Sequence, residues 1–304
     1  MDLHGKRVFI TGITSPLGGE IAGLLTRARA DVVGLVRDKR RIGHHLANVD
    51  IVEGDCQDTG CYRDCVRSSA FIIHAAGLHL SSYVIRACAG HDHLRRIVFI
   101  SSMRARYPDF LLCKEEARGK RVLLEQEREI ATSLLPWTIL RPTLIFSVGD
   151  RSFARVRQLM TRRRVFPVPG NGHATRQPIS ARDLAASTIG ALLSASAHRK
   201  SYDLPGEMNS VLCLLETLRD ELGIPVRLVR IPRLPVKMMR GACNVFGLDK
   251  YGAALTSFLR WYYGFDWSGD AAACDFAHAP RSFRQNVREQ IVNEASRSFR
   301  PSAS

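Results

Sequence analysis

The chain has 304 residues, of which 45% are hydrophobic and 24% are charged, values that exclude a disordered or membrane-spanning chain. A single core stops growing at about 250 to 300 residues, so we expect one full domain with a smaller lobe. The formal net charge of +15 attracts anions such as nucleotide phosphates, nucleic acid or an acidic membrane face. Nucleic acid is not expected, because the basic runs at 39–41 and 162–164 accompany no nucleic-acid-binding motif.

The cysteines indicate a reducing compartment. Eight cysteines form no CxxC pair and no signal peptide is seen at the N-terminus, so reduced thiols and a cytoplasmic location are expected. The spacing of Cys56, Cys61 and Cys65 matches no familiar zinc pattern, so no metal site is expected. No apolar run reaches the roughly 20 residues that span a bilayer.

Short β-branched runs alternate with helical stretches in the first half of the chain, which is the pattern of βαβ units and a parallel sheet. Beyond residue 141 the pattern loosens into Gly/Pro-rich turns and helical stretches. We therefore predict an α/β fold, a Rossmann-type doubly wound parallel sheet with a smaller helix-rich C-terminal lobe. The expected strands are 7–11, 31–36, 49–53, 71–75, 96–101 and 137–141, and the expected later helices are 182–195, 212–222 and 249–263.

Composition also predicts where the domains divide. The Rossmann domain is expected to span residues 1–165, with 173–204 returning to it, and the substrate lobe to span 205–292. Residues 293–304 are polar and rich in Ser and Arg, so a frayed, disordered tail is expected there.

The first expected strand runs into a glycine-containing turn and then a helix, which is the context of a dinucleotide-binding site. Residues 11–19 read TGITSPLGG. Gly12 permits the tight turn and Gly18 lets the helix pack closely on the sheet, the first and third roles of a GxGxxG-type fingerprint. Ser15 and Pro16 form a favoured helix start, whose positive end suits a diphosphate. The residues expected to hold the cofactor here are Gly12, Thr14, Ser15, Pro16, Leu17 and Gly18.

The end of the second expected strand favours NADP(H) over NAD(H). An NAD site would place a carboxylate there for the ribose hydroxyls, but Val36 and Arg37 occupy the position. Arg37, helped by Arg40 or Arg41, would hold a 2′-phosphate through charge-assisted hydrogen bonds. In the alternative interpretation, Asp38 takes the ribose and the arginines are only solvated.

Five further segments follow the expected strands in order. They read GD at 54–55, HAAG at 74–77, FISS at 99–102, RPTLIF at 141–146 and QPISARDLA at 177–185. Together with the TGITSPLGG turn, they resemble the short-chain dehydrogenase/reductase superfamily in its extended and atypical branch, which is related to NAD-dependent epimerases and dehydratases. The resemblance implies that Asp55 meets the adenine, that Ala75, Ala76 and Gly77 lie beneath the cofactor, and that Pro142 and Thr143 lie beside the nicotinamide.

The resemblance also implies a catalytic set that this chain does not fully carry. The family uses a Ser or Thr to orient the substrate oxygen, a Tyr as general acid/base and a Lys four residues later. Lys114 fits the Lys position, but Phe110 stands at the Tyr position and Met103 at the Ser/Thr position. Several interpretations remain open: Tyr107 takes the Tyr role, Ser101 or Ser102 orients the substrate, Lys114 acts alone, or Lys114 only fastens the ribose and little redox chemistry occurs.

The leading functional interpretation is an NAD(P)-dependent oxidoreductase or epimerase of the extended type, acting on a nucleotide-linked sugar or a similar carbonyl or hydroxyl substrate. The resemblance implies that Arg176 lies where relatives grip a substrate's phosphates and that Arg281 belongs to a late segment of the family. A nucleotide diphosphate-sugar would suit both arginines as substrate-binding residues. The alternative is a non-catalytic NADP(H)-binding regulator or accessory subunit. The sequence leaves open whether the protein forms a homodimer. The amphipathic stretch 235–263 is expected to pack in a core, with docking to a membrane surface as a minority hypothesis.

Overall fold

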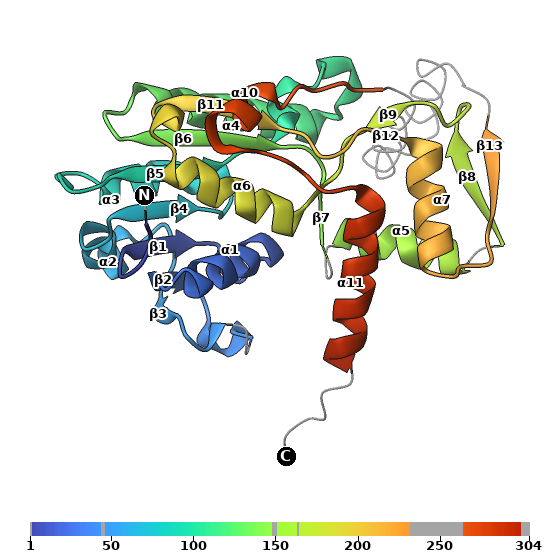
Figure 1. The fold of residues 1–304 in the computed structure, drawn as a ribbon. Coiled ribbons are helices and arrows are strands. Elements are labelled where there is room, and N and C mark those ends of the chain that lie inside the picture. The colour runs from blue at the N-terminus through green and yellow to red at the C-terminus, as the bar shows by residue number, and fades with distance from the viewer. Residues whose placement is uncertain (1, 44–45, 148–150, 163, 232–263, 299–304) are drawn as a thin grey trace.

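A seven-stranded parallel sheet forms the centre of the computed structural model, which describes residues 2–43, 46–147, 151–162, 164–231 and 264–298 (Figure 1). The spatial order of the strands is β11-β6-β5-β4-β1-β2-β3. Since β2 and β4 flank β1, the chain winds outward from β1 in both directions. The strands are β1 (Arg7–Thr11), β2 (Asp31–Val36), β3 (Asp50–Glu53), β4 (Phe71–His74), β5 (Arg96–Ile100), β6 (Trp137–Pro142) and β11 (Lys200–Leu204).

Helices cover both faces of the sheet, because alternate side chains of each strand point to opposite sides. In β1, Val8 and Ile10 join the core beneath helices α1 (Pro16–Arg27) and α6 (Ala181–Leu193). Phe9, between them, joins the opposite core. The helices on that side are α2 (Arg63–Arg67), α3 (Ser81–Ala87) and α4 (Lys114–Thr132).

A second, smaller core lies beside the carboxyl edge of the sheet (Figure 1). Two parallel strands, β8 (Val165–Pro169) and β13 (Arg227–Ile231), pack with helices α5 (Arg151–Arg162), α7 (Val211–Glu221) and α11 (Phe283–Ser298). Helix α10 (Asp270–Phe276) instead packs back on α6 and β11. Short strand pairs join the two cores, namely β7 (Ile145–Phe146) with β10 (Ile179–Ser180), and β9 (Thr175–Arg176) with β12 (Asn209–Ser210).

These observations confirm the predicted fold class. The six expected strands agree with β1 to β6 to within one residue at each end, and α6 and α7 match two of the expected helices. The third expected helix, 249–263, and the amphipathic stretch 235–263 that contains it lie outside the described residues. The predicted tail at 293–304 overlaps α11, which continues to Ser298. None of the described helices is both long and apolar enough to cross a membrane.

Candidate functional site

Three adjoining cavities lie at the carboxyl ends of the central strands, which is where open α/β sheets bind ligands. The β2 cavity, of about 460 Å³, is bounded by the ends of β1, β2 and β3. The α4 cavity, of about 710 Å³, lies beside helix α4, and the aromatic cavity, of about 320 Å³, lies beyond it. The first two share Ser15, Ala75, Ala76, Gly77 and His79, and the last two share Ser102, Arg104 and Ile145. The three cavities therefore adjoin one another in a row, which is called the path below.

The turn after β1 leaves no room for any residue but glycine at its two ends. Gly12 has a φ of +75°, and a Cβ there would lie 2.6 Å from the backbone of Ala75 and Ala76. A Cβ on Gly18 would lie 2.3 Å from the carbonyl oxygen of Gly12. The predicted roles of both glycines thus have a steric basis, and the turn meets the loop after β4 at backbone contact.

Ser15 closes the turn by capping helix α1. Its hydroxyl accepts a hydrogen bond of 3.0 Å from the backbone N–H of Gly18, and Pro16 follows as the first helical residue. Thr14 and Ser15 line the β2 cavity, and Pro16 and Leu17 line the α4 cavity. The helix therefore begins between the two cavities, where a diphosphate would join the two halves of a dinucleotide.

The β2 cavity contains Arg37 and Asp55 but not Asp38. Arg37 is exposed at the end of β2, and the Asp55 carboxylate accepts a hydrogen bond of 2.8 Å from the backbone of Gln57. The Asp38 carboxylate is engaged by the Arg40 guanidinium, with contacts of 3.0 and 3.1 Å, and also accepts from the Arg40 backbone N–H. Arg37 is therefore the cationic side chain that lines this cavity, while Asp38 and Arg40 bind each other.

The loop after β4 rests on a buried histidine. His74 makes a hydrogen bond of 2.7 Å to the Thr11 hydroxyl at the end of β1 and one of 3.3 Å to the Gly77 carbonyl. Burial lowers the pKa of His74 to about 4, so the ring is neutral at physiological pH. A neutral ring fixes the loop of Ala75, Ala76 and Gly77 against the glycine turn without placing a charge beneath the cavities.

None of the α4 side chains that line the α4 cavity can donate a proton. The α4 residues that line it are Gly119, Val122 and Leu123, of which the first and last are four residues apart. Lys114 is the exposed first residue of α4, and the Phe110 side chain is 57% exposed. Neither lines any of the three described cavities, because the helix reaches the cavity more than a turn beyond Lys114.

The hydroxyl of Ser101 is held by a buried ionic network. It donates a hydrogen bond of 2.6 Å to Glu127 on α4, which binds the Arg141 guanidinium at 2.7 to 3.1 Å. Asp203 on β11 contacts the other side of Arg141 at 3.3 Å. Burial would lower the pKa of Arg141, but the two carboxylates raise it overall. Sequence reasoning missed Glu127, although a carboxylate in line with Leu123 and Ile130 on the buried side of a helix signals a buried ionic partner.

Ser102 lies where the α4 and aromatic cavities meet, and its hydroxyl accepts from the backbone N–H of Arg104 at 3.2 Å. Tyr107 lines the aromatic cavity. Lys120 on α4 anchors this loop, because its Nζ donates to the Tyr107 carbonyl and to Asp109, both at 2.8 Å. Of the predicted catalytic residues, Tyr107, Ser101 and Ser102 therefore come together along the path, whereas Lys114 does not.

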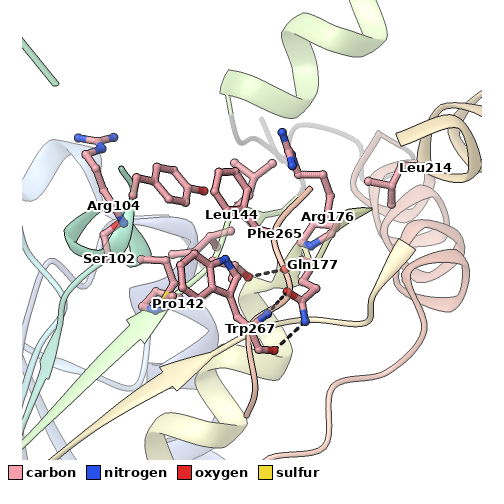
Figure 2. Close-up of a pocket in the computed structure, with 14 residues that line it drawn as sticks. Ser102, Arg104, Pro142, Leu144, Arg176, Gln177, Leu214, Phe265 and Trp267 are labelled. Carbon is pink, nitrogen blue, oxygen red and sulfur yellow. Dashed lines mark hydrogen bonds between the residues drawn. The ribbon is translucent and has the colours of Figure 1, made fainter. Parts of the chain in front are cut away.

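The aromatic cavity has a wall that sequence reasoning missed. Figure 2 shows Trp267 joined by hydrogen bonds to Gln177, with Phe265 beside it in the segment that pairs with Thr175 to Gln177. This cavity is lined by three residues predicted from the sequence, Pro142, Thr143 and Arg176, and none of them lines the α4 cavity. No local motif marks residues 265–267, because their partners lie about 90 residues earlier in the chain.

Arg281 lies apart from Arg176. Its guanidinium binds Asp183 at 2.7 Å, Glu289 at 2.5 Å and Asn286 at 2.8 Å. It lines a fourth cavity of about 440 Å³ between α1, the start of α6 and α11, which shares Ser15 with the β2 and α4 cavities but no residue with the aromatic cavity. The structure therefore does not bring the two predicted substrate arginines together, and Arg281 joins α11 to α6. Among the described residues, no three His, Cys, Asp or Glu side chains are grouped as a metal site.

Comparison with known proteins agrees with this geometry. Residues 12–192 match a family described as NAD(P)H-binding. Among solved structures, the chain is similar to the epimerase Mth375 from Methanothermobacter thermautotrophicus, with 17% identity, a TM-score of 0.74, and 99% and 96% of the two chains covered. No curated protein matches the sequence.

Two further structures have the same fold. The enzyme WbmF from Bordetella bronchiseptica, in complex with NAD+ and UDP, has 13% identity and a TM-score of 0.73 over 97% and 94% of the chains. The UDP-glucose 4-epimerase from Thermotoga maritima, with UDP-glucose, has 12% identity and a TM-score of 0.70 over 96% and 99%. These likenesses, all below 25% identity, show that the three structures share the fold of this chain. The chain belongs to the NAD(P)H-binding family.

Proposed function

We propose that the protein is an NADP(H)-dependent oxidoreductase that reduces a carbonyl group, or oxidises the corresponding alcohol, on a small molecule held in the aromatic cavity. The observation that carries this proposal is that the α4 cavity and the aromatic cavity adjoin, because Ser102, Arg104 and Ile145 line both. A protein that only stored a dinucleotide would have no need of a second cavity opening onto its nicotinamide end.

The residues present fit a dinucleotide. The backbone contact between Gly12 and the 75–76 peptide leaves a hollow on each side of helix α1, and the shared lining residues join the two hollows. Arg37 would bind the 2′-phosphate in the β2 cavity, the start of α1 would meet the diphosphate, and Ala75 to Gly77 would lie beneath the cofactor. When bound, the nicotinamide supplies or accepts a hydride.

Reduction of a carbonyl also requires a proton at its oxygen, and the chain must supply it without the usual Tyr and Lys. Gly119 and Leu123 occupy the two positions on α4, four residues apart, that line the cavity. Tyr107 is the phenol that lines the adjoining aromatic cavity, and Lys120 fixes the backbone of its loop. We assign the proton to Tyr107, with Ser102 orienting the substrate oxygen from the boundary between the cavities.

Nucleotide-linked sugars are one substrate class for this site. WbmF was solved with UDP and the Thermotoga enzyme with UDP-glucose, and both share the fold of this chain. Arg104 and Arg176 would offer cations to a diphosphate in the aromatic cavity. Other carbonyl and hydroxyl compounds form the second class.

The test combines cofactor binding with turnover. Calorimetric titration of the full chain with NADPH and NADH should give saturable binding, tighter for NADPH. A panel of nucleotide sugars and small carbonyl compounds should then include one that consumes NADPH. Tyr107→Phe should lower that turnover at least about tenfold without weakening NADPH binding, whereas Tyr83→Phe, on α3 and outside the three cavities, should not. Unchanged turnover in Tyr107→Phe would remove the role of this phenol.

A regulator or accessory subunit that binds NADP(H) without catalysis is the second candidate. Gly119 and Leu123 favour it, because neither side chain can donate a proton or bind a ribose hydroxyl. Saturable NADPH binding with no turnover across the whole panel would select this function over the oxidoreductase.

A further inference from the structure

The lining of the aromatic cavity points beyond oxidoreductase activity to a class of substrate. We infer that this cavity selects a planar aromatic ring carrying a carboxylate, in preference to a sugar. The inference rests on the proposed function, because the ring would bear the carbonyl group that is reduced. In that step NADPH is oxidised to NADP+, its hydride goes to the carbonyl carbon, and a proton goes to the oxygen.

Three aromatic rings whose planes lie within 28° of one another stand at one side of the cavity. The Tyr107 and Phe265 ring centroids are 4.8 Å apart with 19° between the planes. The Phe265 and Trp267 centroids are 5.8 Å apart with only 9° between the planes, and Tyr107 lies 6.4 Å from Trp267. Side chains in this arrangement present a common stacking direction, which an unsaturated ring satisfies better than a puckered one.

The backbone holds two of these rings in place. The Thr175 hydroxyl donates to the Phe265 carbonyl at 3.0 Å, and the Phe265 N–H donates to the Thr175 carbonyl at 3.3 Å. The Gln177 amide donates to the Trp267 carbonyl and accepts from the Trp267 N–H, each at 2.9 Å (Figure 2). Residues two apart in an extended segment point to the same side, so this pairing directs Phe265 and Trp267 together into the cavity. The wall is therefore preorganised.

Two polar side chains of the cavity, Gln177 and Thr143, already have hydrogen-bond partners within the protein. Gln177 already uses both ends of its amide on Trp267, and the Thr143 hydroxyl donates to the Gln177 carbonyl. A sugar ring brings several hydroxyls that each lose a water partner on entry, and a group left without a replacement costs about 1 to 3 kcal/mol. A flat aromatic ring brings no such requirement.

The charge of the cavity favours an anion. Arg104 and Arg176 line it, and the described lining residues include no acidic side chain. The Arg176 guanidinium lies over the Phe265 ring, 5.2 Å from its centroid, so this cation belongs to the stacked wall. Arg104 lies on the opposite boundary, where the α4 cavity begins. A carboxylate on the substrate ring would meet a guanidinium in the fork geometry that guanidinium groups favour.

The experiment measures binding to the full chain saturated with NADP+, by calorimetry. The probes are 4-carboxybenzaldehyde, its saturated analogue 4-formylcyclohexanecarboxylate, uncharged benzaldehyde, and UDP-glucose. The carboxylated aromatic aldehyde should bind at least about fivefold tighter than the saturated acid, which has the same charge but no flat ring. It should bind about tenfold tighter than benzaldehyde, which has the ring but no charge.

Substitutions of residues that line the aromatic cavity test whether these residues cause the two preferences. Phe265→Leu should remove most of the preference for the flat ring, and Phe265→Tyr, which keeps a ring, should retain it. Arg104→Leu should weaken 4-carboxybenzaldehyde but not benzaldehyde. Phe110→Leu, an exposed ring outside the three cavities, is the matched control and should change neither. Unchanged NADPH affinity in the Phe265 and Phe110 variants shows that the fold and the cofactor site persist. Arg104 also lines the α4 cavity, so Arg104→Leu is judged by the ratio of its affinities for 4-carboxybenzaldehyde and benzaldehyde.

The outcomes separate this inference from the proposed function. Equal binding of the flat and saturated acids, or tighter binding of UDP-glucose than of 4-carboxybenzaldehyde, overturns the inference while saturable NADPH binding leaves the oxidoreductase standing. Failure of NADPH to bind overturns the proposed function first. Consumption of NADPH with 4-carboxybenzaldehyde, abolished by Tyr107→Phe, would support both.

Discussion

The positive φ of Gly12 and its contact with the loop after β4 are separate constraints on one residue. Gly5 offers the comparison, because its φ is +65° and no atom lies within 4 Å of where its Cβ would be. Gly5 therefore isolates the backbone constraint, and the difference between the two positions isolates the contact with Ala75 and Ala76.

We expect Gly12→Ala to abolish NADPH binding and to lower the free energy of unfolding by about 2 to 4 kcal/mol, since left-handed strain and overpacking add. Gly5→Ala should lose only about 1 to 2 kcal/mol and keep NADPH affinity. Denaturant unfolding and calorimetry measure both quantities. Equal losses in the two variants would mean that the backbone contact beneath the turn is not a constraint.

At the end of β2 the prediction concerns coenzyme choice. Arg37 lines the β2 cavity, whereas Asp38 and Arg40 bind each other. Arg37→Ala should weaken NADPH about tenfold or more and leave NADH nearly unchanged, since only NADPH carries the 2′-phosphate. Arg67→Ala, an exposed arginine on α2, is the control. If Arg37→Ala weakened both coenzymes equally, the arginine would bind a group that the two share.

At the scale of elements, the sequence predicted what depends on local pattern. β1, β2, β4, β5 and β6 are mostly buried runs rich in β-branched residues, so each is visible as an apolar segment. The edge strand β3 is only partly buried, but its central Ile51 and Val52 still mark it. The edge strand β11 reads KSYDL, is half exposed and pairs only with β6. Its polar composition gives no apolar segment from which a strand could be predicted. The wall of Phe265 and Trp267 depends on pairing with Thr175 and Gln177 about 90 residues away, which no local pattern encodes.

The sequence likewise could not predict which residues of α4 face the cavity. The sequence put Lys114 at the family's Lys position, four residues after Phe110. In the structure, however, Gly119 and Leu123 of α4 line the cavity. Glu127, one turn beyond Leu123, fixes this register by binding Ser101 on one side and Arg141 on the other. A helix turns about 100° per residue, so a start point uncertain by a few residues leaves its functional face undetermined.

The register of α4 predicts which substitutions would supply the cavity with the missing phenol and ammonium groups. Phe110→Tyr should leave turnover of NADPH within about twofold of the parent, because the side chain at 110 is exposed outside the three cavities. The double variant Gly119→Tyr, Leu123→Lys should raise turnover of a carbonyl substrate at least about tenfold, by adding a phenol and an ammonium on the cavity side. Steady-state kinetics with saturating NADPH measures both. A gain from Phe110→Tyr alone would show that the Phe110 loop reaches the cavity.

At the scale of the whole molecule, buried histidines tie the two cores to the sheet. His74 holds the loop beneath the cavities. His278, between α10 and the helix α11 of the second core, bonds the Ser187 hydroxyl on α6 at 2.8 Å and the Pro205 carbonyl at 2.9 Å. Burial lowers the pKa of both side chains, that of His74 to about 4. The folded protein therefore keeps both rings neutral at a pH where the unfolded chain protonates them.

This difference predicts that stability falls as the pH falls. The unfolded chain binds a proton at His74 below its ordinary pKa of 6.5, whereas the folded protein does so only near pH 4. The unfolded state thus binds more protons between these values, so the contribution of His74 to stability is complete above pH 6.5 and is lost toward pH 4, by up to about 3 kcal/mol. Denaturant unfolding at a series of pH values should show a steeper slope in the parent than in His74→Asn. His93→Asn, at an exposed position, should keep the slope of the parent, and an unchanged slope in His74→Asn would mean that His74 is not protonated on unfolding.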